Sequence, residues 1–142
     1  MATQNGTNYA KSANPSLSNR NVPGAVGGRV RSLTDQFTFA GELAGEVIRI
    51  GKDLVAGAII HKIIIDNAAL GAGVTLDVGD SDDAGRYATA YDANGNIHIE
   101  TTLIGGVHYV IGTNDGDNTI LVTTGVAAAT GLLKVTILYS ED

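Results

Sequence analysis

Four aspartates between residues 77 and 83 form the densest group of potential metal ligands in the sequence: Asp77, Asp80, Asp82 and Asp83. Carboxylates this close together could bind Ca²⁺, a hard cation that takes roughly six to eight oxygen ligands. Their spacing is not that of an EF-hand loop, which has a central glycine and a closing glutamate. Aspartates that cap backbone amides are also typical of a solvated turn. We therefore interpret residues 80–83 as a surface turn, with calcium binding as the alternative.

The other reactive side chains do not form a catalytic pattern. His61, His98 and His108 lie on three separate strand-like segments, without the short spacing of a histidine metal site. The alternation predicts that His98 and His108 are exposed, and that His61 packs among isoleucines. The sequence has no cysteine, and its only serines after residue 33 are Ser81 and Ser140. Because it also lacks a nucleophile elbow and a phosphate-binding loop, we expect neither an enzyme nor a bound cofactor.

The charges are divided unevenly along the 142 residues. Residues 1–33 carry four basic and no acidic residues (+4), whereas residues 34–142 carry five basic and fifteen acidic residues (5 − 15 = −10). A basic arm on an acidic body is predicted to lie along an acidic protein surface. Four charges with a single aromatic residue do not favour nucleic acid as the partner. No signal peptide and no apolar run of about 20 residues is present, so we expect no membrane association.

The chain divides into an arm and a body. Residues 1–33 are rich in Asn, Ser, Gly and Ala and contain both prolines, which predicts an extended N-terminal arm that orders against a partner. Residues 34–142 show short alternating segments about ten residues apart. The predicted strands are 36–40, 47–50, 58–66, 74–78, 86–91, 97–100, 107–111, 119–123 and 132–139. Residues 66–73 and 125–131 are predicted to be loops.

This pattern predicts an all-β fold, a jelly-roll-like β-sandwich of about eight strands, with an immunoglobulin-like sandwich as the alternative. One strand, 58–66, has isoleucines on both faces. Strict alternation would place Ile60 and Ile64 on the face opposite Ile63 and Ile65. A strand that is apolar on both faces is covered on both sides or contributes to an interface. We therefore predict that Ile60, Lys62 and Ile64 lie near a subunit interface.

The segment 75–87, TLDVGDSDDAGRY, resembles small virion proteins of tailed bacteriophages. In many of these a strand ending in Leu-X-Val-Gly-Asp precedes an Asp-rich turn and an Arg-aromatic pair. The matching residues are Leu76, Val78, Gly79, Asp80, Asp82, Asp83, Arg86 and Tyr87. The chain is similar in kind to capsid cement, or decoration, proteins. The recognisable motif covers only this segment. The Ile-rich strand before it and the Gly-rich arm are also of the kind found in such proteins.

The resemblance implies a structural role. Cement proteins oligomerise on the capsid exterior, bridge neighbouring capsomers and resist the pressure of packaged DNA. We accordingly expect a homo-oligomer, a dimer or trimer, that is made in the bacterial host cytoplasm and binds the major capsid protein. Arg20, Arg29 and Arg31 would anchor the arm electrostatically. The alternatives are a tail, neck or head-fibre component and a small-ligand-binding jelly roll such as a cupin-like enzyme, whose histidine cluster this sequence lacks.

Overall fold

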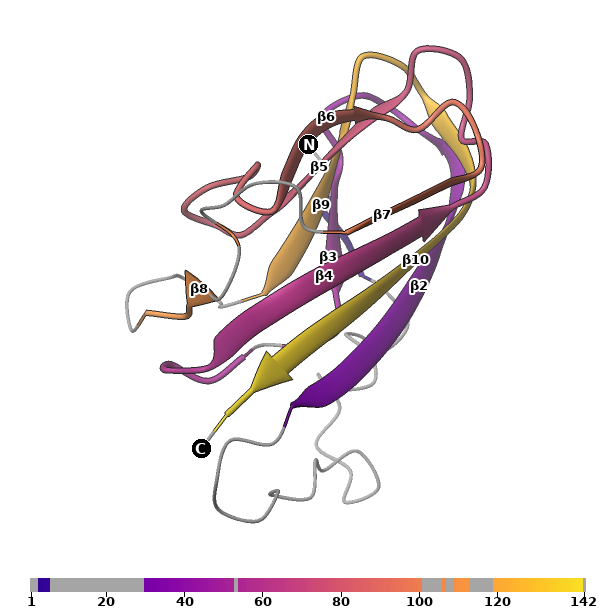
Figure 1. Cartoon of the computed structure of the whole chain (residues 1–142). Coiled ribbons are helices and arrows are strands. Elements are labelled where there is room, and N and C mark those ends of the chain that lie inside the picture. Colours follow the sequence, from indigo (N-terminus) through magenta and orange to yellow (C-terminus); the bar gives the residue numbers. More distant parts are fainter. Residues whose placement is uncertain are drawn as a thin grey trace.

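The computed structural model describes residues 3–5, 30–52, 54–100, 106, 109–112 and 119–141 (Figure 1). These residues form ten strands and no α-helix, so none of the described segments is a helix that could cross a lipid bilayer. The strands are β1 (Thr3–Asn5), β2 (Arg31–Glu42), β3 (Val47–Ile50), β4 (Ile59–Asn67), β5 (Thr75–Gly79), β6 (Ala88–Asp92), β7 (Ile97–Glu100), β8 (Tyr109–Val110), β9 (Ile120–Gly125) and β10 (Ala129–Ser140).

The strands form two sheets packed face to face. One sheet, sheet A, has the order β1-β3-β9-β5-β6, and the other, sheet B, has the order β2-β10-β4-β7, with β8 also paired to β4. Figure 1 shows β4, β10 and β2 side by side in front of β3 and β9. In sequence order, the first strand of the body pairs with the last, the second with the second-last, and so on inward. The pairs are β2 with β10, β3 with β9, β4 with β7 and β5 with β6. This pairing is that of a jelly roll and confirms the predicted all-β, jelly-roll-like sandwich.

One strand was not predicted: β1 forms within the predicted arm. The other nine strands correspond to the nine predicted segments, and two of them, β7 and β8, both pair with β4. β3 and β7 have the predicted bounds. β10 begins at Ala129, so the loop predicted at 125–131 is partly strand. Gly131 allows this, because its φ is +120° and a Cβ there would lie 3.2 Å from the Ala69 carbonyl oxygen.

The core lies between the inner faces of the two sheets. In β10 every second side chain is buried, Leu133, Val135, Ile137 and Tyr139, as the alternation predicts. Phe39 of β2 is also buried, and its ring meets that of Phe37 edge to face, with the centroids 5.1 Å apart. Burial of these apolar side chains is the main favourable term in folding.

A β-bulge in β4 changes which isoleucines face the core. Opposite β10 the register passes from Leu138↔Lys62 directly to Tyr139↔Ile60, which leaves His61 as the extra residue. Ile60, Ile63 and Ile65 are consequently all fully buried. Ile60, predicted near a subunit interface, therefore lies in the core of its own chain. A bulge reverses the alternation that the prediction assumed.

The predicted boundary between arm and body lies inside a strand. β2 begins at Arg31, where it pairs with Tyr139, three residues before the expected start of the body at residue 34. Thr3–Asn5, at the start of the predicted arm, pair in parallel with Val47–Arg49 of β3. Residues 6–29 lie outside the described residues.

Candidate interaction surface

The Asp-rich turn between β5 and β6 is organised by Asp80. This residue is 2% exposed, and its carboxylate accepts bonds from the backbone amides of Asp82 and Asp83, at 3.1 and 2.9 Å. Arg86 donates to the same carboxylate from Nε, at 2.6 Å, and from a terminal nitrogen, at 3.3 Å. These bonds to Asp80 raise the pKa of the Arg86 guanidinium, and burial opposes them. Asp80 thus stabilises the turn from within it.

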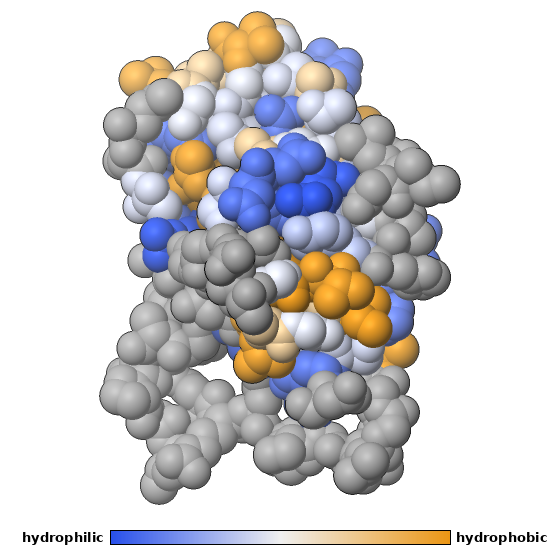
Figure 2. Space-filling model, turned by 90° about the vertical axis from the view of Figure 1, so that its left-hand side faces the viewer, coloured by the Kyte–Doolittle hydropathy of each residue, from blue (hydrophilic) through white to orange (hydrophobic). Residues whose placement is uncertain are grey.

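The remaining aspartates of the turn divide into two kinds. Asp77 accepts bonds from the Thr89 hydroxyl, at 3.3 Å, and from the Ala90 amide, at 2.5 Å, so it connects β5 with β6. Asp82 and Asp83 are exposed, as expected of a surface turn. Figure 2 shows hydrophilic side chains gathered in the middle of the side of the molecule from which this turn projects. Within the described part of the chain, no three His, Cys, Asp or Glu side chains are grouped to hold a metal ion.

The segment that carries the phage resemblance has structural roles in this fold. A Cβ at Gly79 would lie 2.0 Å from the Asp83 carbonyl oxygen, so only glycine fits between strand and turn. The Arg86 guanidinium lies over the Tyr109 ring, 3.9 Å from its centroid, and the Tyr87 ring meets Tyr109 edge to face. The Gly-Asp and Arg-Tyr pairs therefore attach the turn to β8 and to the core.

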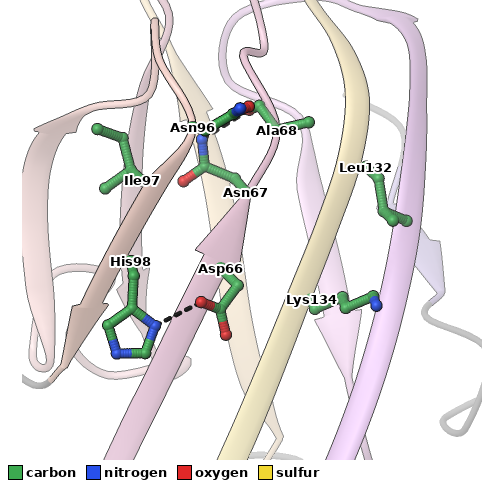
Figure 3. Close-up of a pocket in the computed structure, with 8 residues that line it drawn as sticks. All are labelled: Asp66, Asn67, Ala68, Asn96, Ile97, His98, Leu132 and Lys134. Carbon is green, nitrogen blue, oxygen red and sulfur yellow. Dashed lines mark hydrogen bonds and ion pairs between the residues drawn. The ribbon is translucent and has the colours of Figure 1, made fainter.

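The outer face of sheet B carries Lys62, which the sequence places near an interface, together with several other charged residues. The register aligns Lys134, Asp66 and His98 in one row across β10, β4 and β7. His98 Nδ1 bonds to the Asp66 carboxylate (Figure 3). Four residues before Asp66 in β4, Lys62 pairs with Glu100 at 3.3 Å. This face thus presents both signs of charge, each partly neutralised within the chain.

Apolar side chains lie among these charges. Ile64 and Leu138 are half-buried and occupy successive rows of the same outer face. Of the three predicted interface residues in β4, Lys62 and Ile64 therefore lie on the outer face. We name the surface around Lys62, Ile64, Asp66, Lys134 and Leu138 the sheet B face. It combines two half-buried apolar side chains with charged groups of both signs.

A hollow of about 350 Å³ lies at the end of the sheet B face. Figure 3 shows the residues that line it: Asp66, Asn67, Ala68, Asn96, Ile97, His98, Leu132 and Lys134. Asn67 fixes its floor, because its side-chain amide donates to the carbonyl oxygens of Ala68, Ala93 and Gly95. The hollow is open to solvent, and its lining combines ionisable groups, Asp66, His98 and Lys134, with apolar groups such as Ile97 and Leu132.

Sequence reasoning missed Asn67 and Asp35. Asn67 follows an isoleucine run, and no local pattern distinguishes it from an exposed strand end. The burial of Asp35 could have been predicted, since in an alternating strand it lies on the same face as Leu33, Phe37 and Phe39. It is 2% exposed, and its Oδ2 accepts a bond from the Gly51 amide at 2.8 Å, which joins β2 of one sheet to the end of β3 in the other.

The edge of sheet B along β2 is closed to a further strand at two points. The amide of Gln36 donates to the Asp35 carboxylate, and the amide of Ala40 donates to the Glu42 carboxylate. An amide held by a carboxylate of its own strand is not available to pair with an added strand. Edge pairing through this part of β2 is therefore disfavoured.

The predicted arginines and histidines have separate local roles. Arg31 pairs with Glu141 at 3.4 Å, which ties the start of β2 to the C-terminal end of the body. His61 Nε2 lies 3.0 Å from the Ser140 hydroxyl, and His98 is exposed as predicted. Arg20, Arg29 and His108 lie outside the described residues.

Comparison with known proteins identifies a shared fold. No protein-family model matches the chain, and no curated protein matches it. Among solved structures, the fold is similar to a chain of the capsid asymmetric unit of cyanophage Pam1, with a TM-score of 0.70, 22% identity and coverage of 92% of this chain and 99% of that one. It is also similar to a chain of the capsid of Ralstonia phage GP4, with a TM-score of 0.66, 16% identity and 99% coverage of both chains. At these identities the likeness establishes the fold.

Proposed function

We propose that this chain is a structural virion protein that binds the outside of a phage capsid as a cement protein, bridging and stabilising capsomers. The observation that carries the proposal is the end-to-end agreement of the fold with chains of two phage capsids, with 99% of each of those chains covered. The resemblance of residues 75–87 to phage virion proteins also supports it, at residues that hold the β5–β6 turn in this fold.

The sheet B face gives the proposed protein a way to form oligomers. Ile64 and Leu138 supply apolar area, while Lys62, Asp66 and Lys134 around them supply charges that fix the register of a partner. We assign this face to contact between copies of the chain. The basic residues Arg20 and Arg29 are assigned to the shell contact, since they precede an acidic body that would otherwise be steered away from an acidic shell.

The proposal is tested with capsids of the phage that encodes this chain, purified from a strain in which its gene is deleted. Added protein is expected to cosediment with these capsids, to saturate at a fixed number of copies, and to raise the temperature at which the capsids break. Cryo-electron microscopy should then place it on the outer surface. Density only at the tail, neck or fibres would instead support another virion role, and failure to bind any part of the particle would overturn the proposal.

A further inference from the structure

Three loops meet at one end of the sandwich. They are residues 43–45, 71–73 and 125–128, which we name the loop tip. The amide of Gly45 donates to the Thr124 carbonyl oxygen at 2.6 Å, and the Thr124 hydroxyl donates to the Leu43 carbonyl oxygen at 2.8 Å. A Cβ at Gly73 would lie 4.0 Å from both Ala127 and Val126. These contacts make the three loops one surface at the upper end in Figure 1.

The loop tip is apolar throughout. All of its residues are Gly, Ala, Val or Leu, although connecting loops are ordinarily polar. Leu43 and Val126 are the two most exposed large hydrophobic side chains in the described part of the chain, at 67% and 78%. Figure 2 shows hydrophobic atoms at the same upper end of the molecule. An exposed apolar cluster on a protein that carries charge elsewhere marks an interaction site.

The backbone at Val126 is strained. Its φ is 68°, in the left-handed region that a β-branched side chain rarely adopts. The Val126 side chain is exposed, so no packing within the chain offsets the free energy of this strain. Asn or Gly would adopt this φ at lower free energy. Strain held at an exposed apolar residue is the combination expected where a side chain is presented to a partner.

The size and shape of the loop tip determine what it can bind. A stable protein–protein interface uses roughly 20–30 residues from each partner, whichever the partner is. The loop tip can therefore anchor a larger contact but cannot form one alone, since it exposes only six residues: Leu43, Ala44, Ala72, Gly73, Val126 and Ala128. Because the tip protrudes, two copies meeting tip to tip would not be complementary in shape. A concave, uncharged pocket on a larger protein fits it.

We propose that the loop tip inserts into an apolar pocket of the capsid shell, with Val126 and Leu43 as its anchors. This inference rests on the proposed function and adds an apolar anchor to the shell contact already assigned to Arg20 and Arg29. It also separates the two surfaces: the loop tip contacts the shell, while the sheet B face contacts other copies of the chain.

The test uses Val126→Asn in the full-length chain. Asparagine tolerates the left-handed φ but removes the apolar group, so the melting temperature of the free protein should rise by a few degrees. Binding to capsids that lack this chain should weaken about ten-fold or more. Ala90→Asn is the matched control, because Ala90 also has a left-handed φ, 48°, and is exposed, but lies outside the loop tip. It should raise the melting temperature and leave capsid binding unchanged.

A second pair of variants tests the same surface through charge. Leu43→Glu should abolish measurable capsid binding, whereas Val55→Glu, at a side chain that is 50% exposed elsewhere on the body, should preserve it. Unchanged binding by Val126→Asn and Leu43→Glu would overturn the docking assignment and leave the cement function standing. A lowered melting temperature for Val126→Asn would contradict the strain argument. If the unmodified chain itself failed to bind, the proposed function would fall, and this inference with it.

Discussion

Asp80 is the most heavily bonded side chain of the Asp-rich turn, with two backbone amides and the Arg86 guanidinium as donors. Removing the carboxylate breaks all of these hydrogen bonds together. Arg86 would then keep its charge in a partly buried position without its partner, and breaking a buried ion pair in this way is strongly destabilising.

We therefore predict that Asp80→Ala lowers the free energy of unfolding by about 3–5 kcal/mol. Urea denaturation of the purified protein measures it. Asp82→Ala is the control, because that carboxylate is exposed, and it should change stability by no more than about 0.5 kcal/mol. Equal effects of the two substitutions would show that Asp80 does not hold the turn together.

The raised pKa of the buried Tyr91 hydroxyl makes the stability of the fold depend on pH. Burial raises the pKa of the Tyr91 hydroxyl well above its ordinary value of 10, and the hydroxyl donates to Asn67 Oδ1 at 3.4 Å. Burial raises the pKa of Tyr139 in the same direction, with Glu141 adding to the shift and Arg31 opposing it. The unfolded chain therefore releases these protons at lower pH than the folded chain does. Stability is fully present below pH 10 and is lost as the pH rises above it.

The expected result is a melting temperature that is constant between about pH 8 and pH 9.5 and falls above pH 10. Tyr91→Phe should make that fall less steep without removing it, since Tyr139 still contributes. Scanning calorimetry between pH 8 and pH 11 measures both curves. Superimposable slopes for the two proteins would mean that Tyr91 does not titrate differently in the folded chain.

Among the elements, β4 combines an inner face that completes the core with an outer face that the interface assignment requires. Its bulge at His61 places Ile60 inside and leaves Lys62 and Ile64 outside. A substitution at Ile64 can therefore disturb an interface without emptying the core.

We predict that the unmodified chain is a dimer or trimer in solution and that Ile64→Asp weakens its self-association at least about ten-fold, because a carboxylate would be buried without a partner. Light scattering after size-exclusion chromatography gives the mass of each protein. Thr123→Asp, on the outer face of sheet A, should leave the mass unchanged. A monomeric unmodified chain would contradict the assignment of the sheet B face.

Most of the strands could be predicted because their alternation is local. Ile48 and Ile50, or Leu133 and Val135, face the core two residues apart, and this period is visible in the sequence. The bulge at His61 and the strand continuation at Gly131 could not be predicted, because each depends on a residue that is distant in the sequence: Tyr139 opposite Ile60, and Ala69 beside Gly131. The bonds of Asp80 to Arg86 also depend on the turn having closed. The same aspartates were consistent with a calcium site or a turn.

At the scale of the whole molecule, the sequence was sufficient for the fold class but not for its surfaces. The number of strands, the Gly-rich turns and the absence of helical periodicity together predicted an all-β sandwich, with a jelly roll preferred to an immunoglobulin-like fold. The sheet B face and the loop tip could not be predicted, since each assembles side chains from segments that are far apart in the sequence.

The position of β10 has a consequence for how this protein is made. β10 lies between β2 and β4 in the middle of sheet B, although it follows both of them in the sequence. A nascent polypeptide still lacking residues 129–140 has no partner for the inner edges of those two strands, so sheet B is completed only after these residues have left the ribosome. With so many pairings between distant segments, folding should be slow for a domain of this size. A chain cut short before β10 would expose two long unpaired strands and would be prone to aggregation.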